Sequence, residues 1–183
     1  MKKDLGAKNL FYPQPVAIIG TWNEDGTPNA MNAAWGGTAD YDKIFLAIEG
    51  HRTNENLSRL GEFTVAFADA AHLVAADYVG IVSGRDVPDK VARAGLTAEN
   101  GHFVSAPVFR EFPITLECRL VETNEYGIIG QVVNAAVDEE ILDGEGRVDP
   151  DQLSLITFDP STMAYVLLGK KVGQAFADGK ALE

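Results

Sequence analysis

Small side chains crowd a segment that otherwise has the pattern of a β-strand. Residues 30–38 include Ala33, Ala34, Gly36 and Gly37, and all four are poor strand formers. Glycine inside a strand often marks the close approach of a ligand or of another backbone. A β-bulge or a tightly packed subunit contact would explain the same residues, so the pattern alone leaves both explanations open.

The segment that precedes these small residues predicts a hairpin. Residues 16–22 are apolar on both faces of a strand, and residues 23–29 contain Asp-Gly, a strong hairpin signal. The chain is then expected to return as one strand over residues 30–38. Because an indole buries a large apolar area, Trp35 is expected in the core rather than against a ligand.

A short helix is predicted shortly after a third strand at residues 44–48. Thr53 is a good N-cap, and two leucines in the next two turns form an apolar stripe. A helix N-terminus has free N–H groups and the positive end of a dipole, which suits a phosphate, and Arg52 would add a forked donor. Taken alone, these residues fit helix capping by Thr53 and Asn56, with Arg52 on the surface, better than phosphate binding.

The rest of the chain alternates short strands with short helices. Lys90 would lie in the first turn of a helix, where the dipole disfavours a cation; a solvated lysine is the simpler explanation, and an anionic partner is the other. Roughly six or seven strands from eight candidate segments predict a mainly β fold, closed into an antiparallel barrel because closure removes exposed edges. The remaining strands are predicted at 62–68, 114–121, 128–137, 155–158 and 165–169, and helices at 70–79 and 86–95.

The composition excludes several classes of protein. The 183 residues are 46% apolar, which suits a single globular domain over 1–183, and the net charge of -12 argues against nucleic acid or an anionic membrane as a partner. Cys118 is the only cysteine, expected as a small buried hydrophobe, and the three histidines lack metal-ligand spacing. No signal peptide or membrane-length apolar run is seen, so we expect a cytoplasmic protein without a metal.

Six segments of the sequence occur in a distinctive order. They are residues 15–21, 29–35, 51–56, 62–66, 83–86 with Asp89 and Lys90, and 165–173. No single segment is specific, but the ordered set spans nearly the whole chain. It resembles the flavin reductase-like family, and in particular its flavoredoxin branch.

The resemblance implies a fold, a cofactor and a set of contacts. The fold is a six- to seven-stranded antiparallel FMN-binding split β-barrel, and the protein would work as a homodimer with the flavin near the subunit interface. The small-residue strand and the helix start agree with this assignment. The resemblance places Asn32, Ala33, Ala34 and Trp35 against the isoalloxazine, Arg52, Thr53, Asn54 and Asn56 at the phosphate, and Lys90 near the phosphate or the polar edge of the flavin.

The chemistry of such a protein belongs to the flavin, which accepts hydride or single electrons. This agrees with the lack of a G-x-S-x-G, H-E-x-x-H or similar motif in the sequence, and we predict no catalytic side chain. The expected function is that of an FMN oxidoreductase that moves electrons between NAD(P)H or a redox partner and an acceptor, without a Rossmann motif for the nucleotide. The alternatives are an FMN electron carrier between redox partner proteins, and a split-barrel module that binds another ligand, such as haem, or none.

Overall fold

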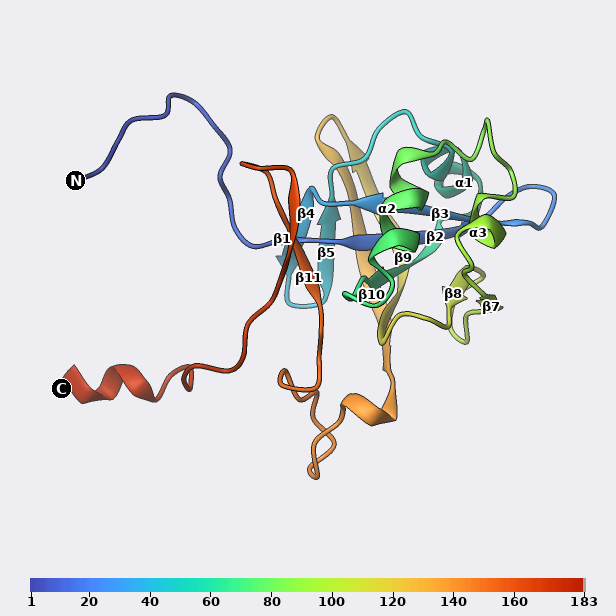
Figure 1. The fold of residues 1–183 in the computed structure, drawn as a ribbon. Helices are drawn as coiled ribbons and strands as arrows, with labels where there is room; N and C mark the ends of the chain where they lie inside the picture. The colour runs from blue at the N-terminus through green and yellow to red at the C-terminus, as the bar shows by residue number, and fades with distance from the viewer. Residues whose placement is uncertain (183) are drawn as a thin grey trace.

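The fold is built around one antiparallel sheet of seven strands. The computed structural model describes residues 1–182. The strand order across the sheet is β3-β2-β6-β9-β10-β5-β4, and Figure 1 shows the β3–β2 side crossing the β5–β4 side steeply, as in a curled sheet. The strands are β2 (Ala17–Trp22), β3 (Pro28–Ala33), β4 (Gly36–Asp40), β5 (Lys43–Leu46), β6 (Glu62–Phe67), β9 (Ile114–Asn124) and β10 (Gly127–Val137).

The two edge strands of the sheet, β3 and β4, are consecutive in the chain. Only Ala34 and Trp35 separate them, and the described strand pairs include none between β3 and β4. The predicted closed barrel is therefore wrong in this detail, because the sheet is a half-barrel that is split between these two strands. The mainly β, split-barrel fold class is confirmed.

The prediction of one strand over residues 30–38 is also wrong. The chain leaves the β2 ladder after Ala33 and joins β5 from Gly36 onward, with the Ala47 N–H donating to the Trp35 carbonyl at 2.7 Å. Gly36 permits this corner, because a Cβ there would lie 2.7 Å from the Phe45 carbonyl oxygen. The small residues therefore mark a change of ladder partner, which their spacing did not reveal.

Three α-helices lie beside the sheet: α1 (Arg52–Leu60), α2 (Leu73–Ile81) and α3 (Lys90–Arg93). The N-cap of α1 is His51, so the prediction of Thr53 as the N-cap is wrong. The reason is that the Asn54 side chain accepts from the His51 N–H at 3.2 Å, which closes the first turn two residues earlier. The predicted helix over 86–95 is likewise wrong in extent, since only the four residues of α3 are α-helical.

Two smaller sheets and two short 3-10 helices complete the structure. The last predicted strands are confirmed within two residues as β11 and β12, which form a sheet with β1. Among residues 1–182, no helix combines the length and apolarity that crossing a membrane requires. The elements are β1 (Gln14–Pro15), β7 (Ala98–Asn100), β8 (Pro107–Phe109), β11 (Ile156–Asp159), β12 (Ala164–Leu167), η1 (Glu139–Ile141) and η2 (Asp178–Leu182).

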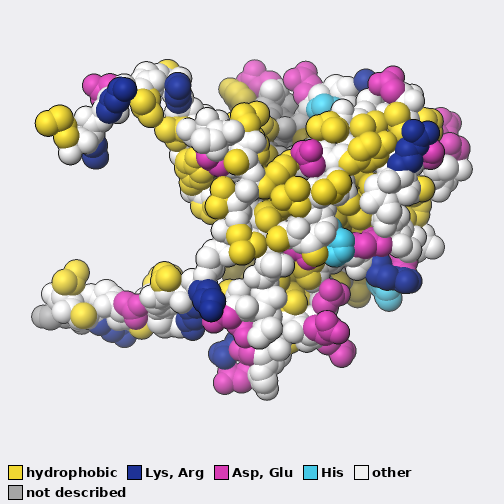
Figure 2. All heavy atoms as spheres, viewed as in Figure 1, with side chains coloured by type: hydrophobic (Ala, Val, Ile, Leu, Met, Phe, Trp, Pro, Cys, Tyr) yellow, Lys and Arg dark blue, Asp and Glu magenta, His cyan; other side chains and the backbone are white. Residues whose placement is uncertain are grey.

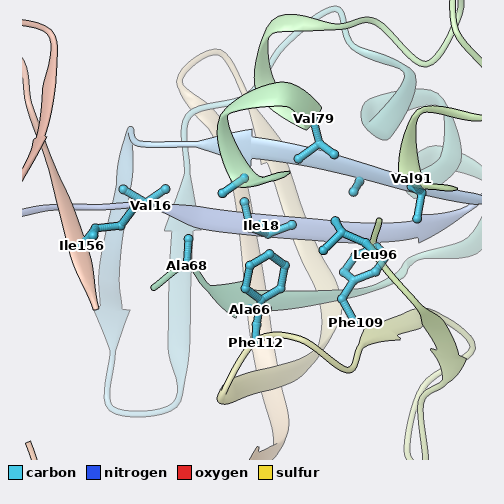
Figure 3. Close-up of a cluster of buried hydrophobic side chains, with 12 residues drawn as sticks. Val16, Ile18, Ala66, Ala68, Val79, Val91, Leu96, Phe109, Phe112 and Ile156 are labelled. Carbon is cyan, nitrogen blue, oxygen red and sulfur yellow. The ribbon is translucent and has the colours of Figure 1, made fainter. Parts of the chain in front are cut away.

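The core lies on both faces of β2 and β6. On one face, Ile18 and Ala66 pack with Val79 of α2 and with Phe109, as Figure 3 shows. On the other face, Ile19 packs inside the curl of the sheet, together with Cys118. Cys118 is fully buried, as predicted, and burial raises the pKa of its thiol to about 12. The structure therefore gives this cysteine a packing role.

Candidate functional site

A hollow of about 220 Å³ lies where β3, the start of α1 and the loop after α2 meet. Thr53 is one of its walls and is only 1% exposed. Its Oγ1 accepts a hydrogen bond from Asn29 Nδ2 at 3.1 Å. The Asn54 and Glu55 N–H groups donate to the His51 carbonyl, so this end of the hollow presents the N–H groups of Arg52 and Thr53 and the positive end of the helix dipole.

Asn29 has an unused hydrogen-bond acceptor in this wall. Its Nδ2 donates to Thr21 and Thr53, whereas Oδ1 is buried and has no partner among the described residues. Gly84 packs directly against it, because a Cβ at this position would lie 2.5 Å from Asn29 Oδ1 and 3.6 Å from Lys90 Cε. Any larger side chain at position 84 would press into the hollow.

Arg52 lines the hollow and belongs to a small group of ion pairs beside it. The Arg52 Nη1 donates to Glu55 Oε2 at 2.9 Å, and its Nε donates to Asn23 Oδ1 at 3.2 Å. Arg85, from the loop after α2, donates to Glu55 Oε1. Hydrogen bonds from Arg85, and to a smaller extent from Arg52, hold the pKa of the Glu55 carboxyl below its usual value. Arg52 is the member of this group that lines the hollow, and Glu55 and the nearby Asp25 carboxylate offset part of the positive charge.

Lys90 closes the other side of the hollow. It is only 4% exposed, and its Nζ donates to the carbonyls of Val79 and Val82 at 3.0 and 2.8 Å. These carbonyls end α2, where the helix dipole favours a cation. Burial lowers the pKa of Lys90 to about 8. The expectation of a solvated lysine is therefore wrong, and one of the three ammonium donors remains for a ligand.

A second hollow, of about 300 Å³, continues the first along β3. The two share Met31, His51, Gly80 and Ile81 as walls, so they form one groove with a narrow polar end and a wider end. The wide end is aromatic. Phe158 and Tyr165 stand there with ring centroids 6.1 Å apart, and Trp35 is 45% exposed, contrary to its expected place in the core.

Helix α2 forms the floor of the wide end because it can approach β3 closely. The Asn32 Nδ2 donates to the Ala76 carbonyl of α2 at 3.0 Å. A Cβ on Gly80 would lie 2.9 Å from the Asn32 Cβ, so glycine is required at this crossing. Nearby, the Tyr165 hydroxyl donates to Asp77 Oδ1 at 2.7 Å. Burial, and then Asp77, raises the pKa of Tyr165 to about 12, so the phenol stays protonated at neutral pH.

The structure brings seven of the nine sequence-predicted residues to this groove. Asn54 and Asn56 are not among its walls. Asn54 Nδ2 donates to the Ile48 carbonyl, and Asn56, buried, donates to Thr21 and Asn23. Both side chains hold α1 against the strands that flank it. The wide end receives Asn32, Ala33, Ala34 and Trp35, and the narrow end receives Arg52, Thr53 and Lys90.

Sequence reasoning missed the walls that come from distant segments. Asp77 and Gly80 lie within α2, and Phe158 and Tyr165 come from the last two strands. Gly80, inside a mostly apolar helix, was the available signal, since such a glycine often has a packing reason. Nothing in the spacing of the aromatic residues indicated that the C-terminal sheet returns to β3.

A family model for the flavin reductase like domain matches residues 9–161 of the chain. The chain belongs to the flavin reductase-like family. This match covers β3, α1, α2 and most of the elements around the groove. The groove therefore lies mostly within the matched segment, with Tyr165 just beyond its end.

Two solved structures are similar over the whole length of this flavin reductase-like chain. One is the flavoredoxin of Desulfovibrio vulgaris (Miyazaki F), at 35% identity, a TM-score of 0.94, and coverage of 98% of this chain and 100% of that one. The other is the flavoredoxin from Methanosarcina acetivorans, at 28% identity, a TM-score of 0.88, and full coverage of both. The chain also matches an uncharacterized protein of Aeropyrum pernix at 28% identity, over 66% of this chain but only 46% of that protein.

Proposed function

We propose that the groove binds FMN, with the phosphate at the narrow end and the isoalloxazine at the wide end. The observation that carries this proposal is the shape of the groove itself. Two adjoining hollows with four shared walls run from a cationic helix start to a wide end bordered by aromatic side chains. A planar ring system with a phosphorylated side chain has the same two halves.

The residues of the groove fit the chemical groups of FMN. Arg52, Lys90 and the first N–H groups of α1 would hold the phosphate, with Thr53 as a wall. The unpartnered Asn29 Oδ1 suits a hydroxyl donor such as those of the ribityl chain. Gly84 keeps this part of the hollow open. Asn54 and Asn56 act here as supports that keep α1 in place.

The ring would lie against the small and aromatic residues of the wide end. Ala33 and Ala34 leave room beside β3, and Asn32 is fixed by its bond to α2. Trp35 and Tyr165 border the same space. The bound flavin supplies the capacity to accept hydride or single electrons. The chain's own contribution is to position the ring, and Tyr165, whose hydroxyl proton is held by Asp77, stays neutral beside it.

The protein then functions as an FMN oxidoreductase that moves electrons from NAD(P)H or a redox partner to an acceptor. All described strand pairs are antiparallel, so a nicotinamide nucleotide would stack on the open face of the flavin instead of using a Rossmann fold. The second candidate is an FMN electron carrier. The net charge of -12 favours it, because such a charge suits docking to a basic redox protein.

Stopped-flow absorbance separates these functions. The FMN-loaded protein is mixed with NADH and, separately, with NADPH, and the flavin absorbance is followed. Rapid bleaching by either nucleotide is the result expected of a reductase. No bleaching, with reduction by a basic redox protein only, identifies the carrier. A protein that takes up no FMN at all contradicts both and leaves a split-barrel module with another ligand or none.

We also expect the protein to act as a homodimer. Large apolar side chains remain uncovered on the body and on both terminal segments, including Phe11 and Phe176. Uncovered apolar surface of this extent marks an interaction site. Sedimentation of the purified protein should give twice the 19.7 kDa of one chain.

Tryptophan emission should report FMN binding at the wide end. Trp35 borders the proposed ring site, whereas Trp22 lies at the far end of β2. We expect FMN to quench most of the emission of Trp35 in a Trp22→Phe variant. In the matched Trp35→Phe variant, the emission of Trp22 should fall much less. Equal quenching of the two tryptophans would contradict the placement of the ring.

The buried lysine should make FMN binding depend on pH. Lys90 loses its charge in the flavin-free protein near pH 8, whereas the unfolded chain keeps the ordinary pKa of 10.5. Between these values the unfolded state binds the extra proton, so the stability of the flavin-free protein should rise with pH in this window. FMN affinity should fall by about tenfold or more as the pH rises above 8, because a charged phosphate contact is lost. Titrations at pH 7 to 10 check this, and Lys90→Met should flatten both profiles.

A further inference from the structure

Two terminal segments project from the body on the same side of the molecule (Figure 1). We call residues 1–12 the N-terminal arm and residues 169–182 the C-terminal arm. Val172 and Phe176 of the C-terminal arm are fully exposed. The Lys171 N–H still donates to Asp151, but beyond it the described hydrogen bonds of this arm stay within the arm itself. A short segment with exposed apolar side chains gains its order from whatever it packs against.

An apolar groove lies at the root of both arms. It is a hollow of about 490 Å³ between β1 and β11 on one side and β4 and β5 on the other. The walls include Ile44, Phe45, Leu116 and Leu168. In Figure 2, apolar side chains gather on the face of the body beside the arms. The hollow therefore has the character of a site for apolar side chains.

Gln14 adds a polar group to this groove. It is 4% exposed, and its buried Oε1 has no hydrogen-bond partner among the described residues. An adjoining hollow, also lined by Gln14, extends to Trp35. The groove thus continues to the wall of the proposed flavin ring site, and it offers an incoming backbone an amide to pair with.

The charges of the arms and of the body are opposite. The body, residues 13–168, holds 24 of the 27 acidic side chains but only 9 of the 15 basic ones. The arms carry six of the eight lysines: Lys2, Lys3 and Lys8 in one, and Lys170, Lys171 and Lys180 in the other. Basic arms on an acidic body are electrostatically complementary, and complementary charge fixes partner and orientation.

We propose that the C-terminal arm crosses to a second copy of this chain and packs Val172 and Phe176 into the groove between β1 and β5 of that copy. This inference rests on the homodimer of the proposed function. The arm leads away from the groove of its own body (Figure 1), whereas a reciprocal exchange covers both grooves of a two-fold dimer. The arm lysines then face the acidic body of the other copy.

Cross-linking between two different variants tests the crossing directly. In a Cys118→Ala background, one protein carries Thr38→Cys at the groove and the other carries Phe176→Cys in the arm. After mixing the FMN-treated proteins and adding a short bismaleimide, we expect a product of twice 19.7 kDa. Val74→Cys, on the exposed surface of α2, replaces Thr38→Cys as the control and should give none. Equal yields for the two mixtures would overturn the proposal.

Sedimentation equilibrium measures the contribution of the arm. The double variant Val172→Ser/Phe176→Ser should raise the dimer dissociation constant at least tenfold, and added salt should raise that of the wild type. Met163→Ser, exposed in the β11–β12 turn, should change nothing. An unchanged dissociation constant for the double variant overturns the proposal, as does arm-dependent pelleting with anionic phospholipid vesicles. A wild type that binds FMN but sediments as one chain overturns the homodimer and the arm exchange but not the flavin assignment, whereas an arm-dependent dimer that binds no FMN overturns only the flavin assignment.

Discussion

The double variant Arg52→Ala/Lys90→Met will bind FMN between about 10² and 10⁴ times more weakly than the wild type. Each substitution removes a cation from the narrow end of the groove. A hydrogen bond to a charged group contributes about 1.5–3 kcal/mol, and about 1.4 kcal/mol corresponds to a tenfold change in affinity. Titration of the flavin-free protein with FMN, followed by flavin fluorescence, measures the loss.

The matched control removes two arginines from the same helices. Arg59 of α1 donates to the Trp22 carbonyl, and Arg93 of α3 pairs with Asp89. Neither is a wall of the narrow end. Arg59→Ala/Arg93→Ala should therefore keep wild-type affinity. If both double variants lost affinity alike, the effect would come from overall charge and not from a phosphate site.

The substitution Phe63→Ala will lower the free energy of unfolding by about 3–5 kcal/mol, since it removes a fully buried aromatic ring from the core. The ring of Phe63 fills the inside of the curled sheet together with Ile19 and Ile128. Urea denaturation followed by circular dichroism measures the change. Phe103→Ala, at an exposed phenylalanine, should stay within about 0.5 kcal/mol.

Gly130 faces the ring of Phe63 inside the curled sheet, and its substitution tests this packing more sharply. A Cβ on Gly130 would lie 2.4 Å from the Phe63 Cζ, so Gly130→Ala destabilises the wild type by overpacking. In the Phe63→Ala background the same methyl group enters the cavity left by the ring. The destabilisation caused by Gly130→Ala should therefore be smaller than in the wild type, or become a stabilisation. Strict additivity of the two substitutions would show that the ring does not pack on Gly130.

Much of the fold could be predicted from periodicity and turn signals. The hairpin of β9 and β10, the buried strand β2 and the strand β6 all follow from local pattern. A helix start near Arg52 was predicted for the same reason, although its N-cap is His51 and not the predicted Thr53. These elements depend on residues that are close together in the sequence, and the periodicity of a sequence reports on such local structure.

The rest depended on contacts between distant segments. Lys90 was expected in solvent, but it reaches the last carbonyls of α2 and becomes buried. Trp35 was expected in the core, but the switch from the β2 ladder to β5 leaves it on the groove. The approach of Tyr165 to Asp77 joins residues 88 positions apart. Local propensity carries no information on such pairings, because tertiary packing decides them.

A crystal structure of the protein grown with excess FMN tests the central claim most directly. We expect density for the isoalloxazine between Trp35 and α2 and density for the phosphate at the start of α1, within reach of Arg52 and Lys90. A groove that stays empty at saturating FMN, or a flavin bound elsewhere on the chain, would contradict the account.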